Sequence, residues 1–167
     1  MKSVDPITVS VIQHRLHAIV DEMGEAMLRT SYSQILNSSR DFSTAISGPA
    51  GRLIAQAEHV PIHVGALPWA VESVAKAFAG RVAPGNVYLL NDPYHGNNHL
   101  PDLTVFVPVF VAGKLLFWSI NRSHQSDIGG ATHGSYNPGA TEIWQESIRI
   151  PPLVSMSAAL CVKMCCK

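Results

Sequence analysis

Four side chains that could bind a metal ion occur in two short stretches of the sequence, His99 with Asp102 and His124 with Asp127. Neutral imidazoles and a carboxylate suit a divalent transition metal, and two imidazoles with one carboxylate leave coordination positions open for water and substrate. A metal held in this way polarises a carbonyl group or lowers the pKa of a bound water. In the alternative interpretation, Asp–His hydrogen bonds fix a glycine-rich loop and bind no metal. The spacing alone leaves both interpretations open.

A predicted β-hairpin between the two stretches would bring these residues together. With a turn at residues 112–114, counting outward along the strands sets Asp102 opposite His124 and His99 opposite Asp127. Directly opposed residues of an antiparallel pair hold their Cβ atoms roughly 5 Å apart. A two-residue turn would shift the register by one and weaken the pairing of Asp102 with His124, so the prediction depends on the length of the turn.

His59 and His63 form a second candidate pair, in the run His-Val-Pro-Ile-His. The intervening Pro61 argues against a helix at this point, so the two histidines are not expected on one helical face. They either line the same pocket or hydrogen-bond a connecting segment, and the connecting role is favoured. His95 and His133 are in predicted loops, and their roles stay open. Arg40-Asp41 and Arg122 could hold a substrate carboxylate, but salt bridges are favoured for each.

The elements that would position these residues predict an α+β fold, with mostly antiparallel strands, a long N-terminal helix and a second packed helix. The first helix has Asp5 as its N-cap and Pro6 at its first position, and its apolar residues recur at helical spacing until near Ser31. The second helix is predicted from about Ala66 to Ala79. Strands are predicted at residues 42–46, 52–57, 87–90, 103–111 and 115–121, with one helical turn around 142–148.

The composition excludes several classes of partner. Lys plus Arg and Asp plus Glu both number 12, so the balanced charge gives no reason to expect nucleic acid or an anionic membrane. Charged residues make up 14% of the chain, which predicts a surface covered by further protein. No apolar run approaches the roughly 18 residues that a membrane span needs. All three cysteines lie within the last seven residues, which favours a reducing, cytoplasmic compartment over a secreted disulfide scaffold.

Nucleotide-binding and nucleophile motifs are absent from the sequence. There is no GxxxxGK[ST] loop, no GxGxxG turn after a predicted strand, and no GxSxG turn. If the reaction uses ATP, another chain must therefore bind it.

Several sequence blocks, in order between residues 4 and 153, resemble the hydantoinase B family. That family includes N-methylhydantoinase B subunits, the matching half of 5-oxoprolinase and a related acetone carboxylase subunit. The blocks are Arg40-Asp-Phe-Ser, residues 51–65, Asn91-Asp-Pro-Tyr, His99-Leu-Pro-Asp, Asn121-Arg-Ser-His, Ala140-Thr-Glu-Ile-Trp-Gln-Glu and Arg149-Ile-Pro-Pro. Because several blocks are long and unusual in composition, chance similarity does not explain them.

The resemblance implies a function and a set of site residues. An A-type partner binds ATP and activates a small cyclic amide, and the B-type part acts on the activated substrate. In the carboxylase-like relatives a His, an Asp three residues later and a second His bind a divalent metal, which correspond here to His99, Asp102 and His124. Manganese, zinc and iron are not distinguished. Further catalytic candidates in the pocket are Asp127, His59, His63 and Glu142.

The resemblance also predicts a domain boundary. Residues 1–153 match the N-terminal part of a hydantoinase B-type domain, and residues 154–167 are interpreted as an unrelated tail. A metal site at the clustered Cys161, Cys165 and Cys166 is a minor alternative. Since family chains continue for several hundred residues, the chain is expected to be part of an ATP-dependent cyclic amide hydrolase. The alternatives are a non-catalytic module that binds the A-type partner, or a carboxylase-type subunit that uses the same metal site.

Overall fold

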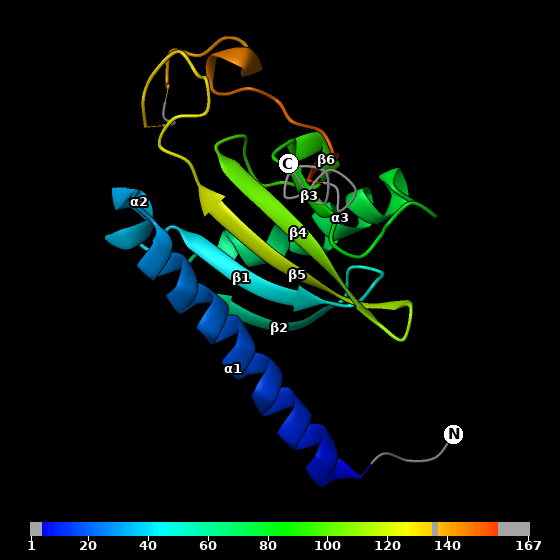
Figure 1. Cartoon of the computed structure of the whole chain (residues 1–167). Helices are drawn as coiled ribbons and strands as arrows, with labels where there is room; N and C mark the ends of the chain where they lie inside the picture. Colours follow the sequence, from blue (N-terminus) through cyan, green and yellow to red (C-terminus); the bar gives the residue numbers. More distant parts are fainter. Residues whose placement is uncertain (1–4, 135–136, 157–167) are drawn as a thin grey trace, which may run out of the picture.

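A six-stranded antiparallel sheet forms the centre of the molecule in the computed structural model, which describes residues 5–134 and 137–156. The strand order is β2-β1-β5-β4-β3-β6, so the two longest strands lie in the middle of the sheet (Figure 1). The strands are β1 (Phe42–Ser47), β2 (Leu53–Glu58), β3 (Val87–Leu90), β4 (Asp102–Val111), β5 (Lys114–His124) and β6 (Leu153–Met156). The helices are α1 (Pro6–Thr30), α2 (Gln34–Asn37) and α3 (Pro61–Ala77), with single 3-10 turns η1 (Pro93–His95) and η2 (Ile143–Gln145). The predicted α+β class is confirmed.

Helix α1 begins and ends as the sequence predicts. The side chain of Asp5 accepts a hydrogen bond from the backbone N–H of Thr8 at 3.1 Å, which caps the helix. The C-terminal half of α1 packs on β1 and β2, where Val20 is fully buried and its carbonyl accepts a hydrogen bond from Thr44 Oγ1 at 2.8 Å. The N-terminal half extends past the sheet (Figure 1), with Ile7 and Val11 exposed.

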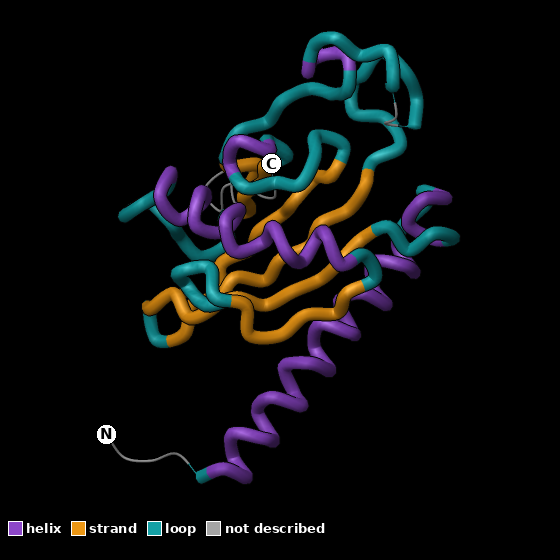
Figure 2. Tube along the Cα trace, turned by 180° about the vertical axis from the view of Figure 1, so that it is seen from behind, coloured by secondary structure: helices purple, strands orange, loops and turns teal. Residues whose placement is uncertain are grey.

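Helix α3 covers the opposite face of the sheet and closes the main core (Figure 2). Its buried residues pack against the inward side chains of β3, β4 and β5, among them Tyr88, Phe106 and Trp118. The sequence analysis placed the start of this helix near Ala66, and that was wrong because α3 begins at Pro61. Proline is well tolerated at the first helical position, where its missing N–H has no intrahelical partner. The earlier start places His63 in the first turn of the helix.

The β4–β5 hairpin has the predicted register at its open end, although its turn differs from the predicted one. Val111 pairs with Lys114, so the turn has two residues, Ala112 and Gly113, both with positive φ, and the predicted three-residue turn was wrong. A bulge between Val109 and Phe110 then adds one residue on β5 and shifts the register back. Asp102 therefore pairs with His124 as predicted. The ladder ends at that pair, so it does not include His99 and Asp127.

Strand β6 is an element that the sequence analysis missed. It pairs with β3 at the edge of the sheet, with Leu153 opposite Leu89, and it crosses the predicted boundary between residues 153 and 154. The sequence analysis predicted no strand here because it interpreted residues from 154 onward as an unrelated tail. The predicted cysteine site at Cys161, Cys165 and Cys166 lies outside the described residues.

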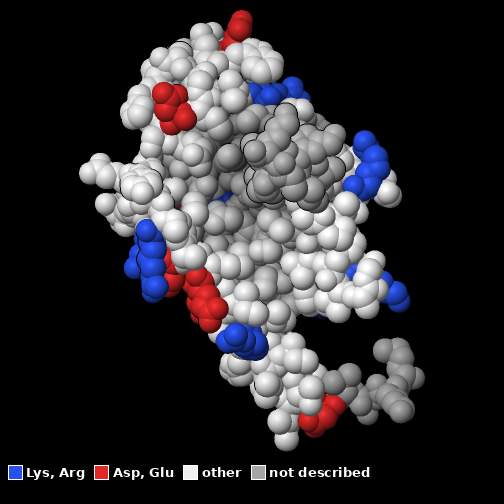
Figure 3. All heavy atoms as spheres, in the orientation of Figure 1, with Lys and Arg blue, Asp and Glu red and all other residues white. Residues whose placement is uncertain are grey.

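The face of the sheet opposite α3 is only partly covered by the described residues. Helix α1 packs against its β1–β2 side, whereas Val107, Val109 and Leu116 on β4 and β5 are 38–43% exposed. In the same orientation as Figure 1, charged side chains follow α1 while much of the remaining visible surface is uncharged (Figure 3). None of the helices in the described part of the chain is long and apolar enough to span a membrane.

Glycine 96 anchors the loop after β3 to helix α3. It has φ +90°, and a Cβ at this position would lie 2.5 Å from the backbone nitrogen of Ala70. Gly80 has a similar φ of +71° but no atom within 4 Å of its would-be Cβ. Comparison of substitutions at the two glycines therefore separates two free-energy costs, that of the left-handed backbone and that of the close contact with α3.

We expect Gly96→Ala to destabilise the protein by about 2–4 kcal/mol, since it combines the left-handed penalty of about 1–2 kcal/mol with an overpacking cost. Gly80→Ala should cost about 1 kcal/mol, because its penalty is conformational alone. Urea unfolding of both variants measures the difference. Equal costs would contradict the tight contact of this loop with α3.

Candidate metal centre

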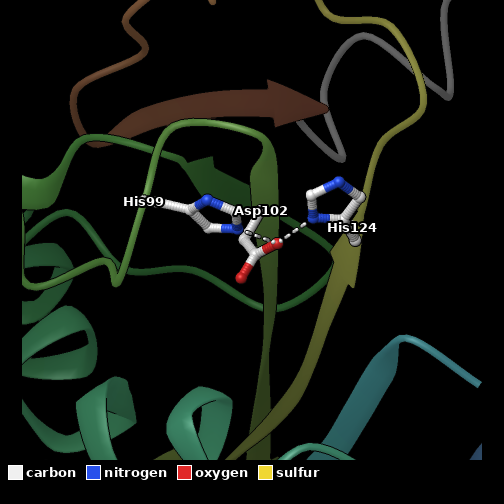
Figure 4. Close-up of side chains that lie close together, drawn as sticks. All are labelled: His99, Asp102 and His124. Carbon is white, nitrogen blue, oxygen red and sulfur yellow. Dashed lines mark hydrogen bonds and ion pairs between the residues drawn. The ribbon is translucent and has the colours of Figure 1, made fainter. Parts of the chain in front are cut away.

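Asp102 is the hub of the candidate site, at the end of the β4–β5 hairpin. It is fully buried, and its Oδ1 lies 2.8 Å from both Nε2 of His99 and Nδ1 of His124 (Figure 4). Its Oδ2 lies 2.9 Å from Nε2 of His63 and also accepts from the side-chain amide of Asn98. Because an ionised carboxylate can only accept, each imidazole must direct an N–H at it. Three histidines from three parts of the chain thus converge on one carboxylate.

Three of these residues have the geometry of a metal-ligand set. One potential ligand atom from each of His99, Asp102 and His124 lies within 4.8 Å of the others. The donor set of two imidazoles and one carboxylate fits a divalent transition metal with open positions. His99 is 40% exposed, so the cluster opens to solvent on that side. A metal ion would take the place of the two N–H protons that now face Oδ1 of Asp102.

The charges of the cluster follow from burial and from these hydrogen bonds. Burial raises the pKa of Asp102, but hydrogen bonds from His124, His63 and His99 outweigh it and hold that pKa far below its usual value. The hydrogen bond to Asp102 raises the pKa of His124 above its usual value, against an opposing effect of burial. Asp102 is therefore a permanent anion, and His124 holds a proton more tightly than a free imidazole.

His63 orients the carboxylate from the far side and is a poor candidate for a ligand. It is 2% exposed, and its Nε2 lies between Asp102 Oδ2 at 2.9 Å and Asp41 Oδ1 at 3.4 Å. Its Nδ1 lies 3.4 Å from the hydroxyl of Ser43. Both ring nitrogens are thus engaged within the protein. The sequence analysis favoured a connecting role for His63, whereas the structure places it in the first turn of α3 with its ring against Asp102.

Asp41, for which the sequence analysis favoured a salt bridge, is a second carboxylate at the centre. Its Oδ2 lies 4.0 Å from Nδ1 of His124, and its side chain is 32% exposed. The backbone N–H of His124 donates to the carbonyl of Asp41 at 3.0 Å, which fixes the two residues side by side. Asp41 precedes β1, the neighbour of β5 in the sheet, so pairing of distant strands brings it here. No local sequence signal could have shown this.

A buried hydrogen-bond network of Arg122, Thr104 and Asn97, called here the polar relay, fixes the backbone next to Asp102. Arg122, fully buried, donates from Nε to Thr104 Oγ1 and from Nη1 to the carbonyl of His63, both at 2.7 Å. Thr104 in turn donates to Asn97, whose amide nitrogen lies 2.6–2.9 Å from the carbonyls of Asn91, His99 and Asp102. Burial lowers the pKa of Arg122 to about 10. The relay fixes the backbone on which two of the candidate ligands lie.

The remaining predicted site residues make other contacts. His59 is exposed and its ring packs on Phe42 at 4.7 Å between centroids. Asp127 is exposed and accepts from the backbone N–H of Gly129 at 3.0 Å, so it does not face His99 as the hairpin count suggested. Glu142 is exposed and caps the short turn η2. These contacts are local, and they place none of the three at the Asp102 cluster.

The chain is an α+β protein with a His–Asp–His cluster that could hold a divalent metal. Within that class the chain belongs to the hydantoinase B/oxoprolinase family, whose model matches residues 5–160. It is similar to caprolactamase subunit beta of Pseudomonas jessenii, at 39% identity over 92% of this chain and 26% of that protein. It is also similar to 5-oxoprolinase 1 of Arabidopsis thaliana, at 40% identity over 87% of this chain and 12% of that protein. The chain thus spans about an eighth to a quarter of these relatives' length.

Solved structures agree with the family assignment. The crystal structure of the ATP-dependent caprolactamase from Pseudomonas jessenii matches with a TM-score of 0.85 and 35% identity, over 98% of this chain and 29% of that one. A nucleotide-free acetone carboxylase structure matches with a TM-score of 0.84 over 92% of this chain and 20% of that one. Its identity is 24%, so it shows a shared fold alone.

We expect the Asp102–His124 pair to make the metal-free protein most stable in mildly acidic solution. The lowered pKa of Asp102 contributes stability above its unfolded value of 3.8 that is lost as the pH falls. The raised pKa of His124 contributes stability below its unfolded value of 6.5 that is lost as the pH rises. We expect the urea midpoint of chelator-treated protein to decrease as the pH falls below 3.8 and as it rises above 6.5. In His124→Gln the fall above pH 6.5 should shrink, and an unchanged profile would contradict the Asp102–His124 interaction.

Proposed function

We propose that this chain contributes the metal centre of a hydantoinase B-type subunit that acts on an ATP-activated cyclic amide. The observation that carries the proposal is the convergence of His99 and His124 on the buried carboxylate of Asp102. It occurs in a chain that is 39% identical to part of a caprolactamase subunit. Two relatives support the substrate class, since caprolactam and 5-oxoproline are both cyclic amides. The whole enzyme's activity is the property of a longer protein.

In this proposal His99, Asp102 and His124 hold the divalent metal. When bound, such a metal polarises the carbonyl of the substrate or lowers the pKa of a water molecule. His63 and Asn98 hold Oδ2 of Asp102, so that Oδ1 keeps a fixed direction toward the open side. Asp41, partly exposed and beside His124, is placed to accept a proton from a water molecule at the centre. Asp127, His59 and Glu142 have no role in this assignment.

ATP is assigned to a partner in the same proposal. The sequence has neither a GxxxxGK[ST] loop nor a GxGxxG turn after a strand, while the related caprolactamase is ATP-dependent by its description. An A-type subunit or domain would therefore bind ATP and activate the amide before the B-type part acts. The name of the related caprolactamase polypeptide, subunit beta, supports an assembly of more than one kind of chain.

A non-catalytic module that binds the A-type partner is the second candidate. The observation that favours it is an apolar groove of about 380 Å³ beside α1, together with exposed valines on β4. The groove is lined by Leu16, Ile19, Met23, Ile46, Val109, Phe117 and Ser119. Failure to form a complex with an A-type subunit would count against this candidate. A carboxylase-type reaction at the same centre would need bicarbonate and a ketone in place of the cyclic amide.

Metal content of the purified protein tests the centre. We expect about one transition metal per chain by plasma mass spectrometry, and near-complete loss in His99→Ala and His124→Ala because each removes one of three ligands. His17→Ala is the matched control, since His17 is an exposed histidine on α1 outside the cluster. Equal metal content in all four proteins would exclude the assigned ligands.

Activity tests the function itself in a complete enzyme. Residues 5–156 of this chain would replace the matching segment of an active caprolactamase or 5-oxoprolinase, assayed with ATP and the cyclic amide. We expect His99→Ala to lower turnover by at least about 100-fold, because loss of a ligand removes the metal. Turnover that survives this substitution would overturn the proposal, and His17→Ala should leave turnover unchanged.

A further inference from the structure

A second cluster of charged side chains lies on the loop between β3 and β4 and has no part in the metal centre. It consists of Asp92, Tyr94 and His95 on this loop and Arg149 from the segment before β6, and it is called here the Arg149 cluster. The sequence analysis left His95 with an open role. Arg149 lies 57 positions away from Asp92, so only the fold brings them together.

Asp92 is the buried acceptor of the Arg149 cluster. It is fully buried, and its Oδ2 lies 2.7 Å from Nδ1 of His95 and 2.8 Å from Nε of Arg149. Its Oδ1 accepts from the backbone N–H of Tyr94 at 3.0 Å. Burial raises the pKa of Asp92, but the hydrogen bonds from Arg149, His95 and Tyr94 outweigh it and lower that pKa below its usual value. Asp92 is therefore an anion that holds both neighbours in fixed orientations.

Arg149 directs most of its hydrogen-bonding capacity away from Asp92. Its guanidinium carbon lies 4.9 Å from the centroid of the Tyr94 ring, so stacking and the Nε bond fix the plane of the group. Neither Nη nitrogen donates to any residue in the described part of the chain, and the side chain is 34% exposed. A guanidinium held in this way offers a pair of parallel N–H donors, which is the arrangement that binds carboxylate and phosphate oxygens.

His95 lies beside the guanidinium, on the same oxygen of Asp92. Because its Nδ1 directs an N–H at Asp92, its other ring nitrogen, Nε2, faces no partner among the described residues, and the side chain is 38% exposed. The His95 ring is therefore open to a ligand that binds Arg149.

The Arg149 cluster is tied to the β3–β4 loop, which carries the candidate ligand His99. The side-chain amide of Asn91 donates to the carbonyls of Leu100 and Ile148, both at 2.8 Å, and accepts from the N–H of Ile150 at 2.6 Å. Leu100 follows His99 in the chain, and Ile148 and Ile150 flank Arg149. One buried asparagine therefore fixes the backbone of both clusters, and His95 and His99 lie four residues apart on the same loop.

We propose that Arg149 and His95, held by Asp92 and Tyr94, form a binding site for the anionic oxygens of a small molecule, either a carboxylate or a phosphate group. The Nη groups of Arg149 would donate to two oxygens of the anion, with the ring of His95 beside them. This site goes beyond the proposed function and does not require a metal. It gives the loop that carries His99 a means to select anionic ligands.

Titration of the whole chain with inorganic phosphate and, separately, with acetate tests the proposal. Two-dimensional NMR would follow the Nε–Hε signal of Arg149 and the ring signals of His95 in chelator-treated protein. We expect saturable shifts of both residues with at least one anion, and the tighter anion identifies the group. Arg149→Gln should weaken that binding at least 10-fold. Arg81→Gln is the matched control, because Arg81 also stacks on an aromatic ring, at 5.3 Å from Phe78, but donates to a backbone carbonyl.

Each result of this titration decides the proposal. Absence of saturable shifts at Arg149 and His95 in the wild type would overturn it, and so would equal loss of binding in Arg81→Gln. If Arg149→Gln fails to fold, the wild-type shifts and the variant Tyr94→Leu test anion binding instead. Tyr94→Leu keeps the ion pair but removes the stacking ring. Because the readout is anion binding without metal or turnover, it is independent of the outcome of the metal and activity experiments.

Discussion

The burial of one carboxylate, Asp102, is the constraint on which the rest of the site depends. A buried anion without partners would cost several kcal/mol, so its oxygens must be satisfied by donors that the fold brings within reach. Here three imidazoles and one amide do so, from the β3–β4 loop, from the end of β5 and from the first turn of α3. Each of these elements is held in place by the sheet or by the polar relay behind it. Two of these donors, His99 and His124, are also the groups that a metal ion would recruit.

Apolar packing and polar contacts stabilise different parts of this structure. Helix α3 closes the core over Trp118 and Phe106, and its first turn delivers His63 to the site. The relay of Arg122, Thr104 and Asn97 then fixes the loop whose carbonyls lie behind the candidate ligands. A fully buried guanidinium is costly to desolvate, which explains why burial lowers its pKa. This arrangement limits the freedom of the ligands, which favours a preformed centre over one assembled by the metal.

Local patterns in the sequence predicted much of the fold and part of the site. The cap at Asp5 and the helical spacing located α1, and strand-sized runs on either side of a turn located β4 and β5. The pairing of Asp102 with His124 was correct although the turn length was wrong, because a two-residue turn and a bulge together give the same register as a three-residue turn. The start of α3 was missed because Pro61 was taken as a helix breaker, whereas it stands at the first helical position. Asp41 and Arg149 were beyond prediction, since long-range pairing alone brings them to their partners.

Nitrogen NMR of the histidine rings during a zinc titration is the sharpest test that His99 and His124 bind a metal, because it identifies which ring nitrogens bind it. At one equivalent of zinc, the account predicts that Nε2 of His99 and Nδ1 of His124 change to the shifts of metal-bound imidazole. His63 should keep its hydrogen bond to Asp102, and His14 and His17 on α1 should be unaffected. Zinc binding at His14, His17 or His59 with no change at His99 and His124 would contradict the assignment of the metal centre.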